Sequence, residues 1–167
     1  MNTNNDTSLA PHLGRLLIDR GWMFSCAESC TGGLLAAAMT ETPGSSQWFD
    51  RGFITYSNAA KVEQLLVNED TLDRFGAVSE ETAMEMAAGV LTTTQLSSLA
   101  ISITGIAGPG GATPGKPVGM VCFGFAQRTA QGVTTRAVTH IFGGDRAAIR
   151  RATVEFALRK AIELIEL

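Results

Sequence analysis

Short apolar segments alternate with amphipathic helical segments along this chain, and this alternation restricts the possible folds more than any other feature. Residues 22–27, 51–57 and 98–105 are apolar runs of strand length. Strands that alternate with helices favour a sheet covered by helices on both faces, so we predict a three-layer α/β/α sandwich. Helical spacing of apolar residues is found in the segments 8–20, 30–42, 59–66, 79–94 and from about 146 onward.

The last third of the chain departs from this alternation. Segments 117–126 and 134–142 predict two strands joined by a turn near Gln131–Gly132, which is typical of a hairpin. An antiparallel hairpin makes the sheet mixed rather than wholly parallel. We therefore predict a mixed, mostly parallel sheet of about five strands in one domain, residues 8–167, after a disordered segment at residues 1–7.

Glycines and small polar residues indicate where the predicted helices begin and end. Gly21 ends the first helix, and Pro43–Gly44 stops the second. Asn58, Ser79 and Asp145 are predicted N-caps, because their side chains can accept hydrogen bonds from N–H groups of the first turn.

The composition argues against several classes of partner. The 167 residues are 45% hydrophobic and 17% charged, with a formal charge of −3, as expected of a globular chain without a basic surplus for nucleic acid. No apolar run approaches the roughly 18 residues of a membrane span, and the polar start does not resemble a signal peptide. The three cysteines predict no disulfide framework. We expect a cytoplasmic protein that binds neither nucleic acid nor membrane.

Four polar or glycine-rich segments follow the predicted strands or precede the last helix. Ligands of open α/β sheets gather at the carboxyl ends of the strands, so chemistry is expected at this edge. The segments are "AESCTGG" (27–33), "TYSNAAK" (55–61), "TGIAGPGG" (104–111) and "FGGDR" (142–146).

Ser29 lies where the first predicted strand meets the next helix. A serine at such a joint is most often an N-cap, and this interpretation stays open. Gly32 and Gly33, however, leave the first turn without side chains, and its N–H groups could hold an anion or a developing oxyanion. Ser29 is therefore a candidate nucleophile. Cys30 is a rival, although a small buried thiol is its more ordinary role.

Lys61 is expected in the first turn of a helix, where the helix dipole disfavours a cation. It could be an ordinary solvated lysine. Partial burial would instead lower its pKa, and the neutral amine could then take a proton from a serine. Tyr56, the only tyrosine, could orient a substrate or relay a proton, or could simply be an aromatic residue of the strand.

Residues 110–116, "GGATPGK", match the G-x-x-x-x-G-K spacing of a P-loop. We reject this match because Pro117 replaces the magnesium-binding serine or threonine, and because a strand follows instead of a helix. The N–H groups of the loop could still line a phosphate or a carboxamide, or the loop could be a flexible turn. Arg146 could clamp a phosphate or lie on the surface. His12 and His140 have no ligand-spaced partners, so neither a metal site nor a histidine triad is predicted.

Six stretches of the chain resemble the C-terminal domain of the competence- and damage-inducible CinA proteins, whose free-standing members are nicotinamide-nucleotide amidases. The stretches occur in order across nearly the whole chain after the first twenty residues. They are "AESCTGG" (27–33), "PGSSQWFDRGFITYSNAAK" (43–61), "GAVSEETA" (76–83), "TGIAGPGG" (104–111), "KPVG" (116–119) and "GDR" (144–146).

The resemblance implies hydrolysis of the carboxamide of nicotinamide mononucleotide (NMN) to nicotinate mononucleotide and ammonia, without a metal or another cofactor. It implies that Ser29 is the nucleophile, that Lys61 is its base and that Tyr56 assists. Glu28 receives no role. The resemblance further implies that the substrate is bound by Thr31, Gly32, Gly33, Thr104, Gly105, Ala107, Gly108 and Arg146.

Two other functions stay open. A nucleotide phosphohydrolase could use the same pocket, but it would need a divalent metal, for which the sequence offers no carboxylate cluster. A non-catalytic module could bind a pyridine nucleotide or a protein partner linked to competence or DNA damage. For the amidase we expect a homo-oligomer, with a dimer favoured.

Overall fold

The computed structural model describes residues 9–167, and the segment 1–7 that we expect to be disordered lies outside these residues. Five strands form one sheet. They are β1 (Met23–Glu28), β2 (Phe49–Ile54), β3 (Ser97–Gly105), β4 (Met120–Thr129) and β5 (Gly132–Ile141). The helices are α1 (Leu9–Arg20), α2 (Leu34–Thr40), α3 (Asn58–Leu65), α4 (Glu69–Phe75), α5 (Glu80–Thr93) and α6 (Arg146–Glu166), with a short 3₁₀ helix, η1, at Ser45–Gln47.

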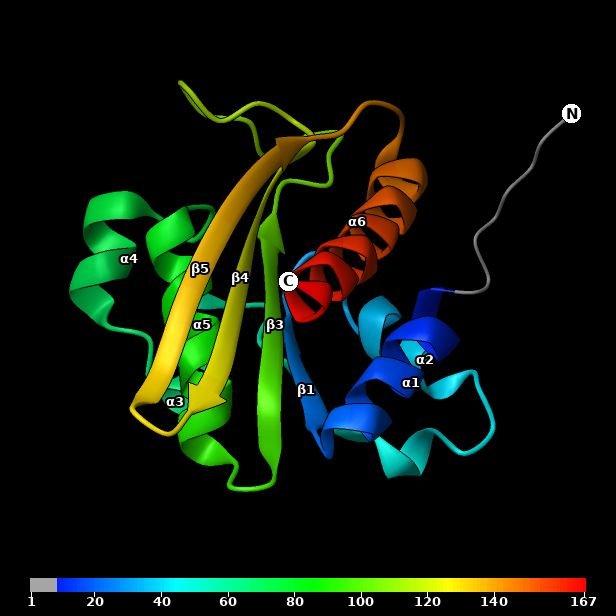
Figure 1. Cartoon of the computed structure of the whole chain (residues 1–167). Helices are drawn as coiled ribbons and strands as arrows, with labels where there is room; N and C mark the ends of the chain where they lie inside the picture. Colours follow the sequence, from blue (N-terminus) through cyan, green and yellow to red (C-terminus); the bar gives the residue numbers. More distant parts are fainter. Residues whose placement is uncertain (1–8) are drawn as a thin grey trace, which may run out of the picture.

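The sheet has the strand order β2-β1-β3-β4-β5 (Figure 1). Strand β1 pairs in parallel with β2 and with β3, whereas β4 runs antiparallel to both β3 and β5. The α/β class and the mixed sheet are therefore confirmed. The predicted hairpin is also confirmed, since β4 and β5 pair as far as Thr129 and Gly132 at their turn.

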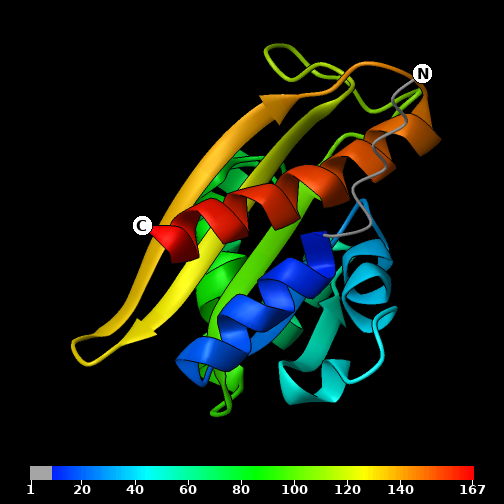
Figure 2. The ribbon, with the colours of Figure 1, turned by 45° about the vertical axis from the view of Figure 1, so that its right-hand side comes forward.

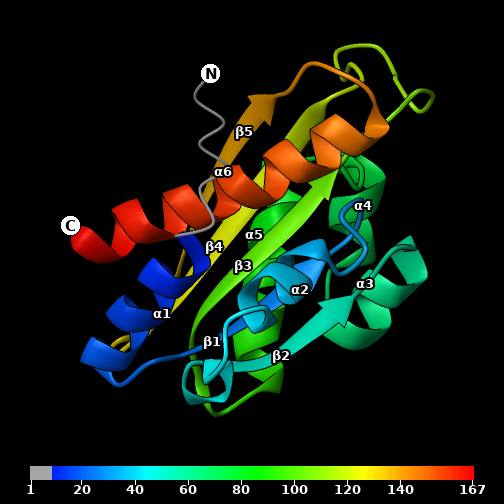
Figure 3. The ribbon, with the colours of Figure 1, turned by 90° about the vertical axis from the view of Figure 1, so that its right-hand side faces the viewer.

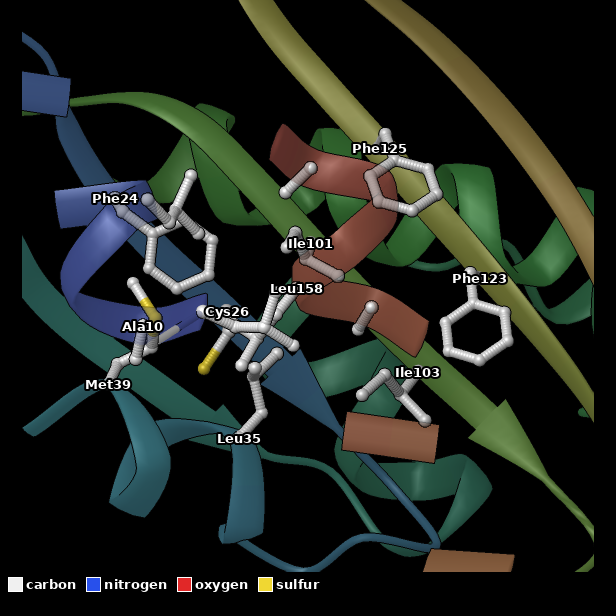
Figure 4. Packing of buried hydrophobic residues seen from close by; sticks show 14 of the residues in the cluster. Ala10, Phe24, Cys26, Leu35, Met39, Ile101, Ile103, Phe123, Phe125 and Leu158 are labelled. Carbon is white, nitrogen blue, oxygen red and sulfur yellow. The ribbon is translucent and has the colours of Figure 1, made fainter. Parts of the chain in front are cut away.

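Helices cover both faces of the sheet. Figures 2 and 3 show α1, α2 and α6 on one face, with α3, α4 and α5 on the other. The face covered by α1, α2 and α6, called the α6 face, holds large side chains such as Phe24, Ile101 and Phe123, which belong to one buried cluster shown in Figure 4. The α5 face presents small residues, and a Cβ added at Gly124 would lie only 2.1 Å from the Ala83 carbonyl oxygen. This lack of side chain lets α5 approach the sheet closely.

Two predicted helix starts are wrong. Helix α2 begins at Leu34 rather than at residue 30, because Gly32 and Gly33 adopt left-handed conformations with φ of +56° and +110°. The N-cap of α3 is Ser57 rather than Asn58, and the Ser57 hydroxyl accepts the Ala60 N–H at 3.0 Å. Both errors lie in the segments that follow β1 and β2.

The N-caps predicted at the other two helices are confirmed. The Ser79 hydroxyl accepts the Thr82 N–H at 3.1 Å, and the Asp145 carboxylate accepts the Ala148 N–H at 2.8 Å. The short helix α4 was not predicted from the sequence. No helix in residues 9–167 combines the length and the apolar character needed to cross a membrane.

One edge of the sheet gathers the segments that follow β1, β2 and β3. The loop 106–119 and the start of α6 lie at this same edge, at the top of Figure 1. The topology thus places side chains from four distant parts of the sequence around one site, as expected for the carboxyl end of an open α/β sheet.

Candidate active site

Ser29 and Lys61 lie side by side at this edge. Ser29 directly follows β1, Lys61 is one turn into α3 after β2, and β1 and β2 are neighbouring parallel strands. The Lys61 Nζ donates a hydrogen bond to the Ser29 Oγ at 3.1 Å. The same ammonium donates to the carbonyl oxygens of Thr55 at 2.8 Å and Tyr56 at 3.3 Å. Lys61 is 1% exposed, so the pair is shielded from bulk water.

Burial changes the acid–base behaviour of Lys61. Loss of solvation lowers the lysine pKa from 10.5 to about 8, and a negative charge on Cys30 would act in the opposite direction. A pKa near 8 leaves a useful fraction of neutral amine at physiological pH. Such an amine can accept the proton of the neighbouring serine hydroxyl, which gives Ser29 the environment of an activated nucleophile.

The Ser29 side chain does not cap α2. The N-cap residue of α2 is Gly33, which provides no side-chain hydrogen bond. The Ser29 Oγ lies 3.4 Å from the Tyr56 carbonyl oxygen, to which it can donate, and it accepts from Lys61. The hydroxyl therefore faces the lysine instead of the helix start.

Glu28, which received no role from the sequence, caps α2 in place of Ser29. Its carboxylate is fully buried and accepts the N–H groups of Leu35 at 2.8 Å and Ala36 at 3.0 Å. A carboxylate at a helix N-terminus satisfies N–H groups that would otherwise have no partner and interacts favourably with the helix dipole. The available signal was an acidic residue at the end of an apolar strand, close before a helix without a polar N-cap.

A pocket of about 300 Å³ opens beside the Ser29–Lys61 pair. Eight residues singled out from the sequence line it: Ser29, Tyr56, Lys61, Thr104, Gly105, Ala107, Gly108 and Arg146. The lining also includes Cys30, the rival nucleophile, and Ile106, Gly110 and Gly111 of the candidate segment 104–111, whereas Ala77 and Val78 received no role in the site from the sequence. No feature of their sequence pattern separates Ala77 and Val78 from other loop residues.

Tyr56 and Arg146 stand together at the pocket. The Tyr56 side chain is 61% exposed, and its hydroxyl accepts a hydrogen bond from an Arg146 Nη atom at 3.2 Å. The other Nη atom of Arg146 donates to the Gly108 carbonyl oxygen at 2.8 Å. Thr104 is buried in the wall, and its hydroxyl donates to the Ala77 carbonyl oxygen at 2.8 Å. Arg146 thus connects Tyr56, which lies shortly after β2, to Gly108 of the glycine-rich loop.

The predicted substrate-binding residues Thr31, Gly32 and Gly33 are not among the residues that line this pocket. Thr31 is fully buried, and within residues 9–167 its hydroxyl has no hydrogen-bond partner. The positive φ angles of the two glycines explain why glycine stands there. The carbonyl oxygens of Cys30 and Thr31 accept hydrogen bonds from Arg150 of α6.

Cys30 is a weak alternative to Ser29 as a nucleophile. Burial raises the pKa of its thiol to about 11, so the reactive thiolate is scarce near neutral pH. Within residues 9–167 no three His, Cys, Asp or Glu side chains are grouped so that they could hold a metal ion.

The fold and the site define an α/β protein whose sheet edge carries a buried serine–lysine pair in a pocket. The model of the CinA C-terminal domain matches residues 6–165, so the chain belongs to this family, as its sequence stretches indicated. A protein of Enterobacter agglomerans, nicotinamide-nucleotide amidohydrolase PncC, is 50% identical over 92% of each chain. The protein of the same name from Escherichia coli K12 is 47% identical over 90% of this chain and 89% of its own.

Other relatives are longer or have known structures. A CinA-like protein of Chloroherpeton thalassium is 53% identical over 96% of this chain, which matches only 38% of that protein. The crystal structure of a competence/damage inducible protein from Agrobacterium tumefaciens superimposes with a TM-score of 0.90 at 43% identity, with 98% of each chain covered. One from Klebsiella pneumoniae gives 0.89 at 37% identity, with 96% of each chain covered.

Proposed function

We propose that this protein hydrolyses the carboxamide of NMN to nicotinate mononucleotide and ammonia by a serine–lysine mechanism. The observation that carries the proposal is the 3.1 Å contact between the Lys61 Nζ and the Ser29 Oγ at a pocket, with the lysine buried and its pKa lowered to about 8. The substrate follows from the names of the two PncC relatives, to which the chain is alignable over about nine-tenths of its length.

In the first half of the reaction, the neutral Lys61 amine takes the proton of the Ser29 hydroxyl while the Oγ bonds to the amide carbon. The carbonyl electron pair moves to oxygen and forms a tetrahedral oxyanion. When this intermediate collapses, the C–N bond breaks and the Lys61 ammonium gives its proton to the leaving nitrogen. Ammonia departs and leaves nicotinate mononucleotide esterified to Ser29.

In the second half, water attacks the ester. Lys61, again neutral, accepts a proton from this water, and the Ser29 Oγ then recovers a proton as the ester bond breaks. The products are nicotinate mononucleotide and free enzyme, so all atoms of one water molecule are accounted for. Neither half of the cycle requires a cofactor.

The pocket has features that suit an anionic pyridine nucleotide. Its charged lining groups are Lys61 and Arg146, with no carboxylate among the described residues that line it. We assign the phosphate to Arg146 and to N–H groups of the loop at Gly108, because a guanidinium and turn N–H groups both bind phosphate. Tyr56 orients the substrate, and Thr104 with Gly105 and Ala107 forms the wall behind it. Thr31, Gly32 and Gly33 act through the turn that carries Ser29.

The proposal extends to the setting of the enzyme. We propose a cytoplasmic homo-oligomer, with a dimer favoured, that acts in pyridine nucleotide metabolism. The alternative is a module that binds a pyridine nucleotide or a protein partner without turnover.

The test is ammonia release from NMN by the purified protein in the presence of EDTA, with a Ser29→Ala variant beside it. We expect release by the parent protein and at least about a thousandfold less by the variant. Equal release from both would remove Ser29 as the nucleophile. No release from a folded parent that still binds NMN would leave the binding module as the function.

A further inference from the structure

Arg150 contacts the turn that carries Ser29 and is not used by the proposed mechanism. Its Nε–H donates to the Cys30 carbonyl oxygen at 3.1 Å, and an Nη atom donates to the Thr31 carbonyl oxygen at 3.3 Å. Arg150 lies one turn after Arg146 on α6; Arg146 lines the pocket, whereas the Arg150 guanidinium contacts the turn after Ser29. Cations near a helix N-terminus are unfavourable, which suggests that these contacts provide a compensating advantage.

The three carbonyl groups that follow the nucleophile are all held by hydrogen bonds. The Ser29 carbonyl oxygen accepts the Gly32 N–H at 3.1 Å. The Thr31 carbonyl oxygen accepts the Leu34 N–H at 3.1 Å, in addition to its contact with Arg150. For the Cys30 carbonyl oxygen, Arg150 is the only donor among residues 9–167.

The orientation of these carbonyl groups determines where the N–H groups point. In a planar trans peptide group the C=O and N–H bonds point in opposite directions. The guanidinium therefore draws the Cys30 carbonyl toward α6 and turns the Thr31 N–H away from it. The Ser29 carbonyl, held by the Gly32 N–H, belongs to the same peptide group as the Cys30 N–H and directs it the opposite way. In the described part of the chain, no backbone oxygen accepts the Cys30 N–H, and Cys30 lines the pocket.

The start of α2 cannot supply the donors that an oxyanion needs. Its N–H groups at Leu35 and Ala36 already donate to the Glu28 carboxylate, and the Gly32 N–H donates to Ser29. Among residues 30–36 of the described chain, the N–H groups of Cys30, Thr31 and Gly33 have no acceptor, and of these three residues Cys30 lines the pocket. Donors of this kind, fixed in advance, stabilise the charge that develops on the attacked carbonyl.

We propose that Arg150 is a positioning residue, which holds the Cys30 and Thr31 carbonyl oxygens and thereby fixes the turn after Ser29, so that the Cys30 N–H stabilises the oxyanion formed by Ser29 at the pocket. When the Oγ bonds to the carbonyl carbon, the carbonyl electron pair moves to oxygen and the serine proton moves to Lys61. Arg150 does not touch the substrate. The inference rests on the proposed function for its substrate, but its test does not depend on NMN alone.

The experiment compares Arg150→Met and Arg150→Lys with Arg151→Met, a change at the exposed neighbouring arginine. Three quantities are measured: kcat and KM for ammonia release from NMN, the thermal unfolding midpoint, and the rate at which a fluorophosphonate labels Ser29. In the labelling reaction the Ser29 oxygen bonds to phosphorus, fluoride leaves and Lys61 accepts the proton, so the reaction also builds negative charge on oxygen.

We expect Arg150→Met to lower kcat and the labelling rate by about 100-fold, with KM changed less than about threefold. Arg150→Lys should recover part of this loss, because an ammonium can donate to one carbonyl oxygen but cannot reproduce the planar pair of donors. Arg151→Met should match the parent in all three measurements. The midpoint of the pH–rate profile, which depends on Lys61, should not move in any variant.

Parent-like kcat and labelling rates in Arg150→Met would overturn the inference, as would losses that only follow the unfolded fraction. If Arg150→Met does not fold, Arg150→Lys decides: a lowered kcat at a parent-like unfolding midpoint supports the inference, and a parent-like kcat overturns it. A parent that is labelled but does not deamidate NMN would refute the proposed function, and the labelling rates alone would then decide the role of Arg150. A folded parent that shows neither labelling nor turnover would refute both.

Discussion

Glu28 and Lys61 are two buried charged residues at the same edge of the sheet, and their surroundings have opposite effects on the stability of their charged forms. Glu28 faces the N-terminus of α2, where two N–H groups and the helix dipole stabilise its negative charge. Lys61 lies near the N-terminus of α3, where the dipole opposes its positive charge, and its partners are two carbonyl oxygens and the Ser29 hydroxyl.

The difference separates a structural charge from a reactive one. A buried carboxylate with well-placed donors gains from being charged, whereas a buried ammonium without a carboxylate partner is readily deprotonated. Glu28 can thus hold the turn that presents Ser29, and Lys61 can exchange a proton with Ser29. Variants of the two residues test this division of roles.

The largest effect is expected from Lys61→Met, which keeps an unbranched side chain of similar length but removes the amine. Without a base next to Ser29, kcat for ammonia release from NMN should fall by about 1,000-fold. The free energy of unfolding near neutral pH should not fall and is expected to rise, since a poorly compensated buried charge is removed. Urea unfolding of the same samples measures this. Lys160→Met, on the outer part of α6, provides the matched control.

A variant that loses both activity and stability would show that Lys61 supports the fold, and the contrast with Glu28 would then be mistaken.

Glu28→Ala should have the opposite profile, with a loss of about 3 kcal/mol in the free energy of unfolding, because the N–H groups of Leu35 and Ala36 lose their acceptors. Glu28→Gln should lose about half as much free energy of unfolding, since its single amide oxygen replaces two carboxylate oxygens as the acceptor of these N–H groups. Urea denaturation measures both. Glu41→Ala, at the exposed end of α2, should change stability by less than about 0.5 kcal/mol. Equal stability of Glu28→Ala and the parent would rule out the capping role.

Much of the fold could be predicted from the sequence because local periodicity and turn residues determine it. The hairpin of β4 and β5 and the caps at Ser79 and Asp145 depend on residues that are close in sequence. The start of α2 was misplaced because the glycine pair at 32–33 is compatible with more than one helix start. The start of α3 was misplaced because Ser57 and Asn58 are adjacent and either could be the N-cap. The φ angles of Gly32 and Gly33 are set by the tight turn after β1, and residue propensities do not predict such angles.

The site residues likewise divide into those that the sequence alone identifies and those that only the folded chain identifies. Ser29, Lys61, Tyr56 and Arg146 were identified because their residue types suggest chemistry, and the sheet topology then brings them to one pocket. Glu28 and Arg150 were missed, since their partners are backbone groups whose orientation exists only in the folded chain. The contacts of Arg150 with backbone groups about 120 residues away leave no pattern in a single sequence, whereas Glu28 left the signal of an acidic residue shortly before a helix without a polar N-cap.

The pH dependence should distinguish Lys61 from Glu28 more finely. The Lys61 pKa is about 8 in the folded protein and 10.5 ordinarily, so between these values the unfolded chain binds more protons and stability rises with pH. The cost of the buried charge is fully present below about pH 8 and is relieved by about 2 kcal/mol at about pH 9.5. Subtracting the unfolding free energies of Lys61→Met from those of the parent at each pH isolates this contribution.

The rate of the parent should rise with the same neutral amine, with a midpoint near pH 8 in kcat/KM. A parent-minus-variant stability difference that stays flat between about pH 7 and about pH 9.5 would mean that Lys61 does not titrate in this range. The reactive role would then have to be explained without a lowered pKa.

The smallest effect concerns the start of α3, which sets the position of Lys61. The Ser57 hydroxyl accepts the Ala60 N–H, so Ser57→Ala should lower the free energy of unfolding by about 1 kcal/mol. Asn58 is the first residue inside the helix and is exposed, so Asn58→Ala should change stability by less than about 0.5 kcal/mol. Urea unfolding of the two variants compares them directly, and a larger loss in Asn58→Ala would place the cap at Asn58. Because the Lys61 N–H donates to the Ser57 carbonyl oxygen, which the substitution retains, kcat should fall less than about threefold in Ser57→Ala.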